Sequence, residues 1–523
     1  MESGDDKLTP QLMKVGALSV PLAFMLCFGL YPLATVIWQL LGNSAAAPMM
    51  VGAGDIAALG LSAGFQALLS TALAVAVGLP IAYVLSLRSF RGRRLLYALV
   101  FVPFILPTVV TGHALRGLIG SAVPQGLGLV LLGHVFVNIA VVVRFVGSAL
   151  ESLDLRYLTQ ARSLGASRAA SWFTIGLPVV RPAIVRAASL VFVYCFSSLG
   201  LLLVLGDRST RTYESEVLRE VSLLLDFRGA AAHTFAQMLV VGAALWLGGR
   251  SRISSAAMSG AESPTRLPIG RGRLAFVVVV GAIYVAPFVW LAVQSISVDG
   301  RFSVDYWVTS WTSDSSLAAV ALKSLGLAAC VGVVASTVGA LAAIAATDMR
   351  LRKWSRVVLA PMLFTSATMG LGMLLSYSRA PFEWERAAAP LVIAQSLLVL
   401  PISYATIVSR MDEADDSMQV VAQSLGASAS RAFFTAYGSR LFTGALSAAG
   451  LCAAIACGEY GAASFLSDFQ TPTLSVFLMR QLGRPGEASM AIASVVAISL
   501  AAIAMLLLGG FERLSKAAEK VRR

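Results

Sequence analysis

Long apolar runs alternate with short polar segments along the whole chain. Twelve runs have about 20 residues or more, the length that an α-helix needs to cross about 30 Å of hydrocarbon. They centre on residues 16–41, 58–86, 96–118, 126–150, 184–206, 230–249, 274–297, 317–346, 357–378, 388–409, 441–466 and 487–510. Backbone polar groups in lipid must pair within the protein, so these runs are expected to be helices. The pattern predicts an all-α polytopic membrane protein with about twelve transmembrane helices.

The composition favours a membrane protein over a soluble one. Of the 523 residues, 57% are hydrophobic and 13% are charged, whereas a soluble surface needs more polar side chains. The net charge of +13 does not indicate nucleic-acid binding, because the basic residues fall in alternate polar segments. Segments 88–94 and 350–356 are basic, and segments 42–57 and 117–125 contain no Lys or Arg. The positive-inside rule therefore places both termini in the cytoplasm, with the arginine-containing segment 207–229 as an exception.

The two halves of the chain are related by a repeat. Residues 1–250 and residues 274–523 each contain six of the predicted spans. Residues 251–273 are rich in Ser, Gly and Pro, which is typical of a flexible linker. An offset of 261 residues pairs His134 with Gln395, Gly200 with Gly461, and Arg219 with Arg480. This predicts two homologous six-helix halves that arose by duplication and run parallel in the membrane.

Each half carries one long polar loop with the same central sequence. Residues 162–167 read Arg-Ser-Leu-Gly-Ala-Ser and residues 423–428 read Gln-Ser-Leu-Gly-Ala-Ser, within loops 151–185 and 411–441. A helix is expected to end at Gly165, because glycine accepts the left-handed conformation that closes a helix. One such loop per half predicts that the two halves present the same cytoplasmic surface to a partner.

The first loop is predicted to form a helix–turn–helix. Ser167 can cap a second short helix that runs through Trp172. Pro178 is expected to end this helix, because proline cannot continue the hydrogen-bond ladder. Trp172 and Phe173 would give the loop an apolar face, as would residues 433–434 in the second copy, and such a face favours a partner. The alternative is an amphipathic loop that lies on the membrane, which the recurrence in both halves disfavours.

The first loop has the spacing Ala, three residues, Gly, nine residues, and then Ile-x-Leu-Pro. In this spacing the chain resembles the permease subunits of ATP-binding cassette (ABC) importers, which carry it as their signature loop. The resemblance implies that both loops are coupling helices, which dock into clefts on two ATPase subunits. The matching positions are Ala161, Gly165, Ala166, Ser167, Ile175, Leu177 and Pro178 in the first loop, and Ala422, Gly426, Ala427 and Ser428 in the second.

The resemblance also implies partners and a location. It implies a multi-pass protein of the bacterial inner (plasma) membrane and an extracytoplasmic substrate-binding protein as a further partner. ATP would be bound by the ATPase subunits, and this chain would bind no cofactor. Thr159 and Gln160 depart from the family's Glu-Ala, and residues 436–439 replace Ile-x-Leu-Pro in the second loop. The second docking site is therefore expected to be weaker or differently shaped.

Fused twelve-span permeases for thiamine and for ferric iron resemble the chain over nearly its whole length. Residues 132–138, Leu-Gly-His-Val-Phe-Val-Asn, are similar to the thiamine permeases. Residues 457–461, Cys-Gly-Glu-Tyr-Gly, are similar to an element found in both groups. The resemblance implies import of thiamine, with ferric iron as the alternative.

Three polar residues inside predicted spans are candidates for the translocation path: His134, Asn138 and Glu459. An ionisable residue in a span is costly and usually faces a cavity or a partner, so Glu459 could favour a cation such as thiamine. Hydrogen bonds between helices are the alternative role for all three. His113 and His233 are lone polar residues near span ends, and three scattered histidines predict no metal site. The five cysteines lie in apolar spans and predict no disulfide framework.

The chain contains no Gly-Lys pair and therefore no phosphate-binding loop of the Walker type. It also lacks a cluster of residues suited to catalysis, so we expect a transport subunit without its own ATPase site. A twelve-span secondary transporter is the first alternative, since the basic segment 91–94 is similar to a loop of major facilitator transporters. That class leaves the polar loops unexplained. A membrane-embedded enzyme is the second alternative, and it would need clustered polar residues in the spans.

Overall fold

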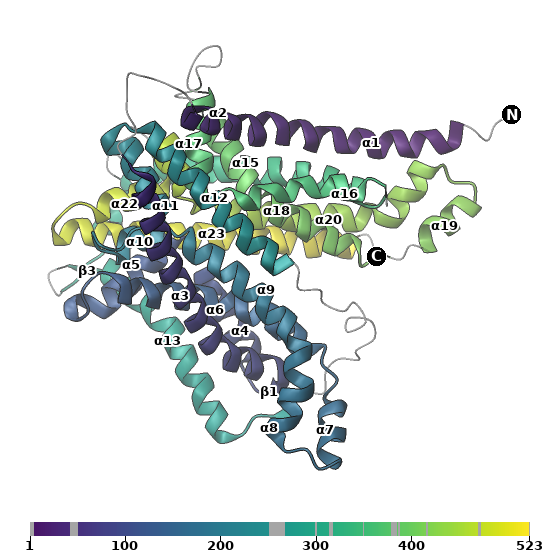
Figure 1. The fold of residues 1–523 in the computed structure, drawn as a ribbon, viewed down its shortest axis with the longest axis horizontal. Coiled ribbons are helices and arrows are strands. Elements are labelled where there is room, and N and C mark those ends of the chain that lie inside the picture. Colours follow the sequence, from purple (N-terminus) through teal and green to yellow (C-terminus); the bar gives the residue numbers. More distant parts are fainter. Residues whose placement is uncertain are drawn as a thin grey trace. The chain divides into compact units, whose positions relative to one another are not determined.

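The fold is almost entirely helical in the part of the chain that the structure describes (Figure 1). This structure is a computed structural model, and it describes residues 5–41, 51–249, 267–298, 301–312, 317–348, 350–377, 384, 388–414, 417–468 and 472–521. Most of the predicted linker, residues 251–266, lies outside these ranges. The prediction of an all-α polytopic membrane protein is confirmed.

The chain forms two compact units, which differ from the two halves of the sequence. One unit combines residues 1–48 with residues 295–523, and the other comprises residues 49–294. The first helical segment of each half therefore packs with the helices of the other half. In the unit that holds residues 295–523, the Tyr377 hydroxyl donates a hydrogen bond to the carbonyl oxygen of Cys27 at 2.6 Å. In the other unit, the Tyr284 hydroxyl donates to the carbonyl oxygen of Phe136 at 3.0 Å.

We call the unit of residues 49–294 the first-repeat unit. Its three central helices, α3, α6 and α9, pack on one another. Its elements are α3 (Ala53–Leu87), β1 (Arg88–Ser89), α4 (Arg93–Ile105), α5 (Thr108–Ile119), η2 (Gly120–Ala122), α6 (Leu127–Glu151), α7 (Leu155–Ser163), α8 (Arg168–Ser171), η3 (Trp172–Gly176), α9 (Leu177–Phe196), α10 (Gly200–Leu205), α11 (Tyr213–Arg219), η4 (Glu220–Leu224), α12 (Phe227–Gly249), β2 (Leu267–Pro268) and α13 (Arg271–Ser295). Strands β1 and β2 pair in parallel, and α3, α6 and α9 form the core.

We call the other unit the second-repeat unit, and its core consists of α15, α18 and α20. Strands β3 and β4 pair antiparallel. Its elements are α1 (Asp5–Met25), η1 (Leu26–Leu30), α2 (Tyr31–Leu41), β3 (Ser297–Val298), β4 (Arg301–Phe302), α14 (Asp305–Thr312), α15 (Leu317–Ala346), α16 (Arg352–Ser355), η6 (Arg356–Leu363), α17 (Ser366–Tyr377), α18 (Ala389–Met411), α19 (Ser417–Ser424), α20 (Ala429–Cys457), α21 (Gly461–Leu466), α22 (Leu474–Leu482) and α23 (Glu487–Val521).

The number of spans agrees with the prediction when bent helices are counted as one. In the described ranges, ten helices are long and apolar enough to cross a membrane, and two bent pairs bring the number to twelve. The pairs are Arg93–Ile105 with Thr108–Ile119, bent by 108°, and Arg352–Leu363 with Ser366–Tyr377, bent by 96°. The first bend falls at Pro107, whose missing N–H and restricted predecessor interrupt the helix.

Two predicted spans extend too far at their C-terminal ends. The helix expected over 184–206 ends at Phe196, and the helix expected over 441–466 ends at Cys457. Short separate helices follow in both cases, α10 and α21. Hydropathy cannot detect these breaks, because the residues on both sides of each break are apolar.

The packing repeats with the same offset as the sequence. A Cβ atom on Gly78 in α3 would lie 2.8 Å from Cβ of Val142 in α6. A Cβ atom on Gly339 in α15 would lie 2.5 Å from Oγ of Ser403 in α18, and both members of this pair are 261 residues further along. Each repeat therefore uses a glycine to let the same two helices approach closely.

Candidate functional site

The first polar loop closes α7 with a left-handed glycine. Gly165 has φ +93°, and its N–H donates to the carbonyl oxygen of Arg162 at 3.1 Å. The N–H of Ala166 donates to the carbonyl oxygen of Ala161 at 3.0 Å. These two bonds satisfy carbonyl groups at the helix end in the manner of a Schellman motif. The predicted end of the helix at Gly165 is confirmed.

The second polar loop has the same closure. Gly426 has φ +86°, and its N–H donates to the carbonyl oxygen of Gln423 at 3.0 Å. The N–H of Ala427 donates to the carbonyl oxygen of Ala422, also at 3.0 Å. Ala161, Ala166, Ala422 and Ala427 are all half-buried, so the two loops match in both backbone geometry and burial.

The prediction that Pro178 ends a short helix is wrong. The helix continues from Arg168 to Phe196 as one span. The π-helical turn η3 lies just before Pro178, and the N–H of Leu177 donates to the carbonyl oxygen of Trp172 across it. A π turn adds one residue to the helical turn, which gives the proline ring room beside the carbonyl groups of the preceding turn. In the second repeat, α20 needs no such turn, because residues 436–439 contain no proline.

The exposed apolar residues of the loops differ partly from those predicted. Leu164 and Leu425, at equivalent positions, are 89% and 83% exposed. Phe173 and Phe434 are exposed as predicted. Phe433 is instead buried in the core. Trp172 is half-buried, with its ring 5.7 Å from that of Tyr83. The two leucines could have been found in the sequence, since each directly precedes the glycine of the shared Ser-Leu-Gly-Ala-Ser motif. Ile175 is half-buried, and Leu177 and Pro178 are exposed.

Ser167 caps the second helix of the first loop, as predicted. Its Oγ accepts a hydrogen bond from the N–H of Ala170 at 3.1 Å. We expect Ser167→Ala to destabilise this helix end by about 1 kcal/mol, which corresponds to about fivefold faster amide exchange at Ala170. Hydrogen exchange followed by mass spectrometry measures this. Ser428→Ala is the matched control, because Ser428 occupies the N-cap of α20 without a side-chain cap bond. Equal effects of both substitutions would contradict the role of the cap.

His134 and Asn138 lie in a buried polar junction between α3, α6 and α9 of the first-repeat unit. Nδ1 of His134 lies 2.9 Å from Oγ of Ser70. Nδ2 of Asn138 donates to the carbonyl oxygen of His134 at 2.9 Å and lies 3.6 Å from Sγ of Cys195. These residues are buried and bridge three helices. The structure thus gives both predicted path residues the geometry of interhelical hydrogen bonds.

The equivalent junction of the second-repeat unit is largely apolar, and Gln395, at the position of His134, is buried and donates to Glu459 instead. An offset of 261 places Val331, Val399 and Ala456 where the first repeat has Ser70, Asn138 and Cys195. The three apolar residues are buried in one hydrophobic cluster. The two repeats therefore share a backbone arrangement but differ in the chemistry of their central helix contact.

Glu459 lies in the second-repeat unit, between the ends of α20 and α21. Its carboxylate accepts hydrogen bonds from the N–H groups of Ala462 and Ala463 at 3.0 and 3.3 Å. It also accepts a bond from Nε2 of Gln395 at 3.3 Å. The residue is half-buried. Glu459 therefore caps α21 and keeps part of its surface accessible.

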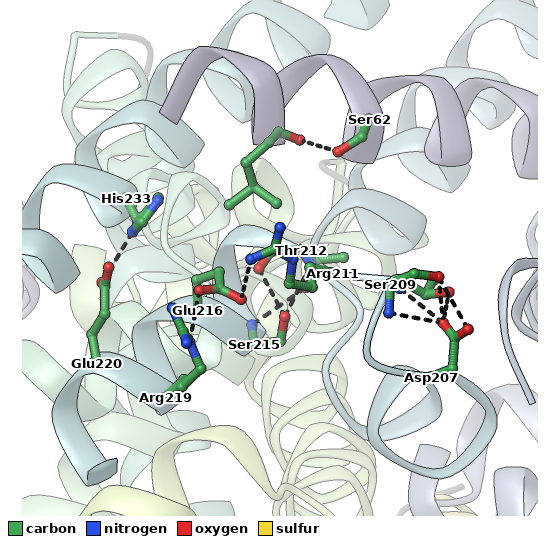
Figure 2. Close-up of polar contacts among 12 residues, drawn as sticks. Ser62, Asp207, Ser209, Arg211, Thr212, Ser215, Glu216, Arg219, Glu220 and His233 are labelled. Carbon is green, nitrogen blue, oxygen red and sulfur yellow. Dashed lines mark hydrogen bonds and ion pairs between the residues drawn. The ribbon is translucent and has the colours of Figure 1, made fainter. Parts of the chain in front are cut away.

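A second polar cluster, for which the sequence predicts no role, follows α10 in the first-repeat unit. Figure 2 shows Asp207 beside Ser209, and Glu216 between Arg211 and Arg219. Oε1 of Glu216 lies 3.7 Å from Nη1 of Arg211, and Oε2 accepts from Nε of Arg219 at 2.9 Å. The Glu216 carboxylate is buried, and both guanidinium groups are about half exposed. One buried carboxylate thus positions two arginines.

His233 is a member of the same cluster, although its sequence position suggested no function. Nδ1 of His233 lies 3.0 Å from Oε2 of Glu220, and Figure 2 shows the two side chains joined by this contact. Both side chains are almost completely buried. They lie 13 residues apart, on η4 and α12, so helical spacing does not predict the contact.

Asp207 begins the loop that leads to this cluster. Its Oδ1 accepts hydrogen bonds from Oγ1 of Thr210 at 2.6 Å and from Oγ of Ser209 at 2.8 Å. These bonds stabilise the carboxylate and lower the pKa of Asp207 to about 2. Because the pKa is lowered, the carboxylate stabilises the loop fully at pH values above the ordinary pKa of aspartate. This stabilisation is lost as the pH falls through about 2.

We expect the Asp207 carboxyl to titrate with a pKa of about 2, and Thr210→Val to raise this pKa because the first of the two hydroxyl donors is removed. Carboxyl ¹³C shifts of the selectively labelled protein in micelles measure both values. Asp154 provides a control carboxyl, because its pKa is lowered by hydrogen bonds from Arg156 and Thr210→Val should leave this pKa unchanged. An unchanged Asp207 pKa in Thr210→Val would show that the hydroxyl does not stabilise the carboxylate.

The described residues contain no group of three or more His, Cys, Asp or Glu side chains that could hold a metal ion. The fold is that of a polytopic α-helical membrane protein with two internal repeats, each presenting an exposed helix–turn–helix loop.

Comparison with known proteins identifies the family. No family model matches the chain. The molybdenum transport system permease protein ModB of Azotobacter vinelandii is 30% identical over 204 residues, which are 36% of this chain and 88% of ModB. A probable molybdenum ABC transporter permease of Haloferax volcanii is 36% identical over 152 residues, 27% of this chain and 55% of the relative. The thiamine transport system permease protein ThiP of Haemophilus influenzae is 28% identical over 194 residues, 33% of this chain and 36% of ThiP.

The chain belongs to the family of ABC transporter permeases. It spans about half the length of the Haloferax volcanii relative, and more than two thirds of ModB.

Proposed function

We propose that this chain is the membrane-spanning permease subunit of an ABC importer. The observation that carries the proposal is the pair of matching loops. Each repeat closes a helix with a left-handed glycine, Gly165 or Gly426, and places an exposed leucine directly before it. Exposed apolar side chains in a fixed geometry suit a partner with an apolar cleft. The partners would be two ATPase subunits, one for each loop.

The matching loops give a physical route from ATP hydrolysis to solute import. This chain has no Walker-type phosphate-binding loop, so ATP would be bound by the partner subunits. Closure of two ATPase subunits would draw the docked loops together and switch the path from inward-facing to outward-facing. An extracytoplasmic substrate-binding protein would then deliver the solute. The first alternative, a twelve-span secondary transporter, is disfavoured by the family of the chain.

We propose thiamine as the imported solute. The matched residues make up 36% of ThiP but 88% of ModB, so ThiP is similar in length to this chain, whereas ModB is less than half as long. A fused, two-repeat chain therefore favours the thiamine type, with ferric iron as the alternative of the same type. Molybdate is a second candidate, because the molybdenum permease of Haloferax volcanii has the higher identity. Of the three candidate path residues, Glu459 is the one that keeps partial exposure, which suits a cationic solute.

The test is uptake in cells that lack the gene and in cells in which it is restored, with labelled thiamine, ferric iron and molybdate offered in parallel. Loss of thiamine uptake alone, with dependence on ATP, is the expected result. Loss of molybdate uptake alone, or of iron uptake alone, would identify that ion as the solute in place of thiamine and would still support the importer function. Uptake that persists after the ATPase subunits are deleted would contradict the importer function itself.

A further inference from the structure

Three consecutive leucines form an exposed tip at the C-terminal end of η4, just before α12, in the first-repeat unit. We call residues 223–225 the leucine tip. Leu223 is 76% exposed and Leu225 is 70% exposed, and Leu224 is more than one third exposed. The tip directly follows the segment that carries Glu216, Arg219 and Glu220. Consecutive exposed leucines beside a polar segment are typical of a surface that contacts a partner.

Leu225 holds a backbone conformation that leucine avoids. Its φ is +54° and its ψ is +25°. Among the described residues, it is the one non-glycine residue with positive φ. The position 261 residues further on is Gly486, with φ +108°, in the sequence Arg-Pro-Gly. The second repeat thus makes the same left-handed turn with glycine, which adopts it without strain. In the first repeat the same turn is made by an exposed leucine, which adopts positive φ at a cost in backbone strain.

Buried polar contacts hold the strained turn from both sides. The N–H of Asp226 donates to the carbonyl oxygen of Glu220 at 3.0 Å, and Oδ1 of Asp226 accepts from the N–H of Gly229 at 2.8 Å. Glu220 is also fixed by His233 (Figure 2). Backbone strain that the surroundings enforce is typical of functional positions. The network therefore keeps the tip in one geometry rather than letting it relax.

The tip lies beside positive charge. Arg219 precedes Leu223 by four residues, which places the two on one face of the helical segment. Arg219 and Arg211 share the single carboxylate of Glu216, and both guanidinium groups are about half exposed. These three groups together carry one net positive charge. A complementary surface would offer an apolar pocket with carboxylates at its rim.

We propose that the leucine tip and its two arginines dock into an apolar, acid-rimmed pocket on the extracytoplasmic substrate-binding protein. This inference rests on the proposed function. The asymmetry of the repeats favours such a partner over lipid. Both repeats meet the same bilayer, so a lipid contact would be expected in both, whereas Arg484 and Pro485 replace two leucines in the second repeat. A single binding-protein molecule has no two-fold symmetry and can use a feature that only one repeat carries.

The test uses the complete importer in lipid nanodiscs, with the binding protein for the solute that the uptake experiment establishes. The double variant Leu223→Ser/Leu225→Gly installs a polar residue and the glycine of the other repeat. We expect it to weaken binding of the binding protein at least tenfold, with unchanged thermal stability and unchanged ATP hydrolysis in the absence of binding protein. Arg219→Glu should also weaken binding. Leu61→Ser, at an exposed leucine of α3, is the matched control and should leave binding unchanged.

Three results would overturn the docking proposal. Unchanged affinity in the double variant would do so directly. A fall in thermal stability in this variant would show that the leucines pack within the chain instead. A fluorophore on Leu223→Cys that lipid-linked quenchers reach, and that the binding protein does not protect, would assign the tip to the bilayer; this measurement requires Cys27→Ser and Cys330→Ser, because both cysteines are exposed. If the wild-type complex transports solute without any binding protein, the proposed function fails together with the docking proposal.

Discussion

Gly165→Pro is expected to abolish the coupling of ATP hydrolysis to solute uptake while the protein stays in the membrane. Proline fixes φ near −65°, and the native φ of Gly165 is +93°. Proline also removes the N–H that donates to the carbonyl oxygen of Arg162 at 3.1 Å. The turn between α7 and α8 would then open, and Leu164 would leave its position on the docking surface. We expect uptake to fall at least about tenfold, equivalent to about 1.4 kcal/mol of lost coupling.

The measurement is solute uptake and ATP hydrolysis by the reconstituted importer. Gly64→Ala is the control, because Gly64 lies inside α3, an added Cβ would meet no atom within 4 Å, and the position should tolerate alanine. Gly426→Pro tests the second loop, whose φ of +86° is equally incompatible with proline. Normal uptake in Gly165→Pro would mean that this loop does not transmit the state of the ATPase partners. A loss in Gly165→Pro but not in Gly426→Pro would show that the second, degenerate loop is dispensable.

Features that depend on neighbouring residues could be predicted from the sequence. The turn at Gly165 and the cap at Ser167 follow from local backbone chemistry, and both are present. The effect of Pro178 was predicted wrongly, because a π turn in the preceding residues accommodates the proline ring. The helix propensity of proline predicts that an α-helix ends at Pro178. It does not predict that a π-helical turn forms before the proline and lets the helix continue.

Features that depend on the rotation of a helix about its axis, or on contacts between residues far apart in the sequence, could not be predicted. Phe433 and Phe434 are adjacent and equally apolar in sequence, yet one is buried and the other exposed, because helix α20 turns by about 100° per residue. Glu220 in η4 contacts His233 in α12, and the chain reverses direction between these two elements, so the spacing of the residues in the sequence does not reveal the contact. Hydropathy also reports only the average polarity of a run, so it reveals neither the bend at Pro107 nor the exchange of first helices between the repeats.

His233→Leu is expected to destabilise the first-repeat unit strongly. It would leave the Glu220 carboxylate buried without its nearest polar partner, Nδ1 of His233 at 3.0 Å. Breaking a buried pair in this way costs about 3–5 kcal/mol. Glu220→Leu should cost less, about 1–3 kcal/mol, because it removes the carboxylate itself rather than leaving it buried without a partner. Thermal unfolding in nanodiscs should order the three proteins as wild type, Glu220→Leu and His233→Leu.

The other repeat supplies the matched control for this pair. Gln481 and Ser494 stand 261 residues after Glu220 and His233, and both are buried. The double variant Glu220→Gln/His233→Ser therefore installs neutral residues that the same fold already accepts in the second repeat. We expect it to be more stable than His233→Leu, because no charge remains unpaired in the interior. If the double variant were the least stable of the four proteins, the stability would come from the shape of the two side chains rather than from their charges. If His233→Leu unfolded at the wild-type temperature, the pair would contribute nothing to holding η4 against α12, and the strained turn at Leu225 would have to be held by Asp226 alone.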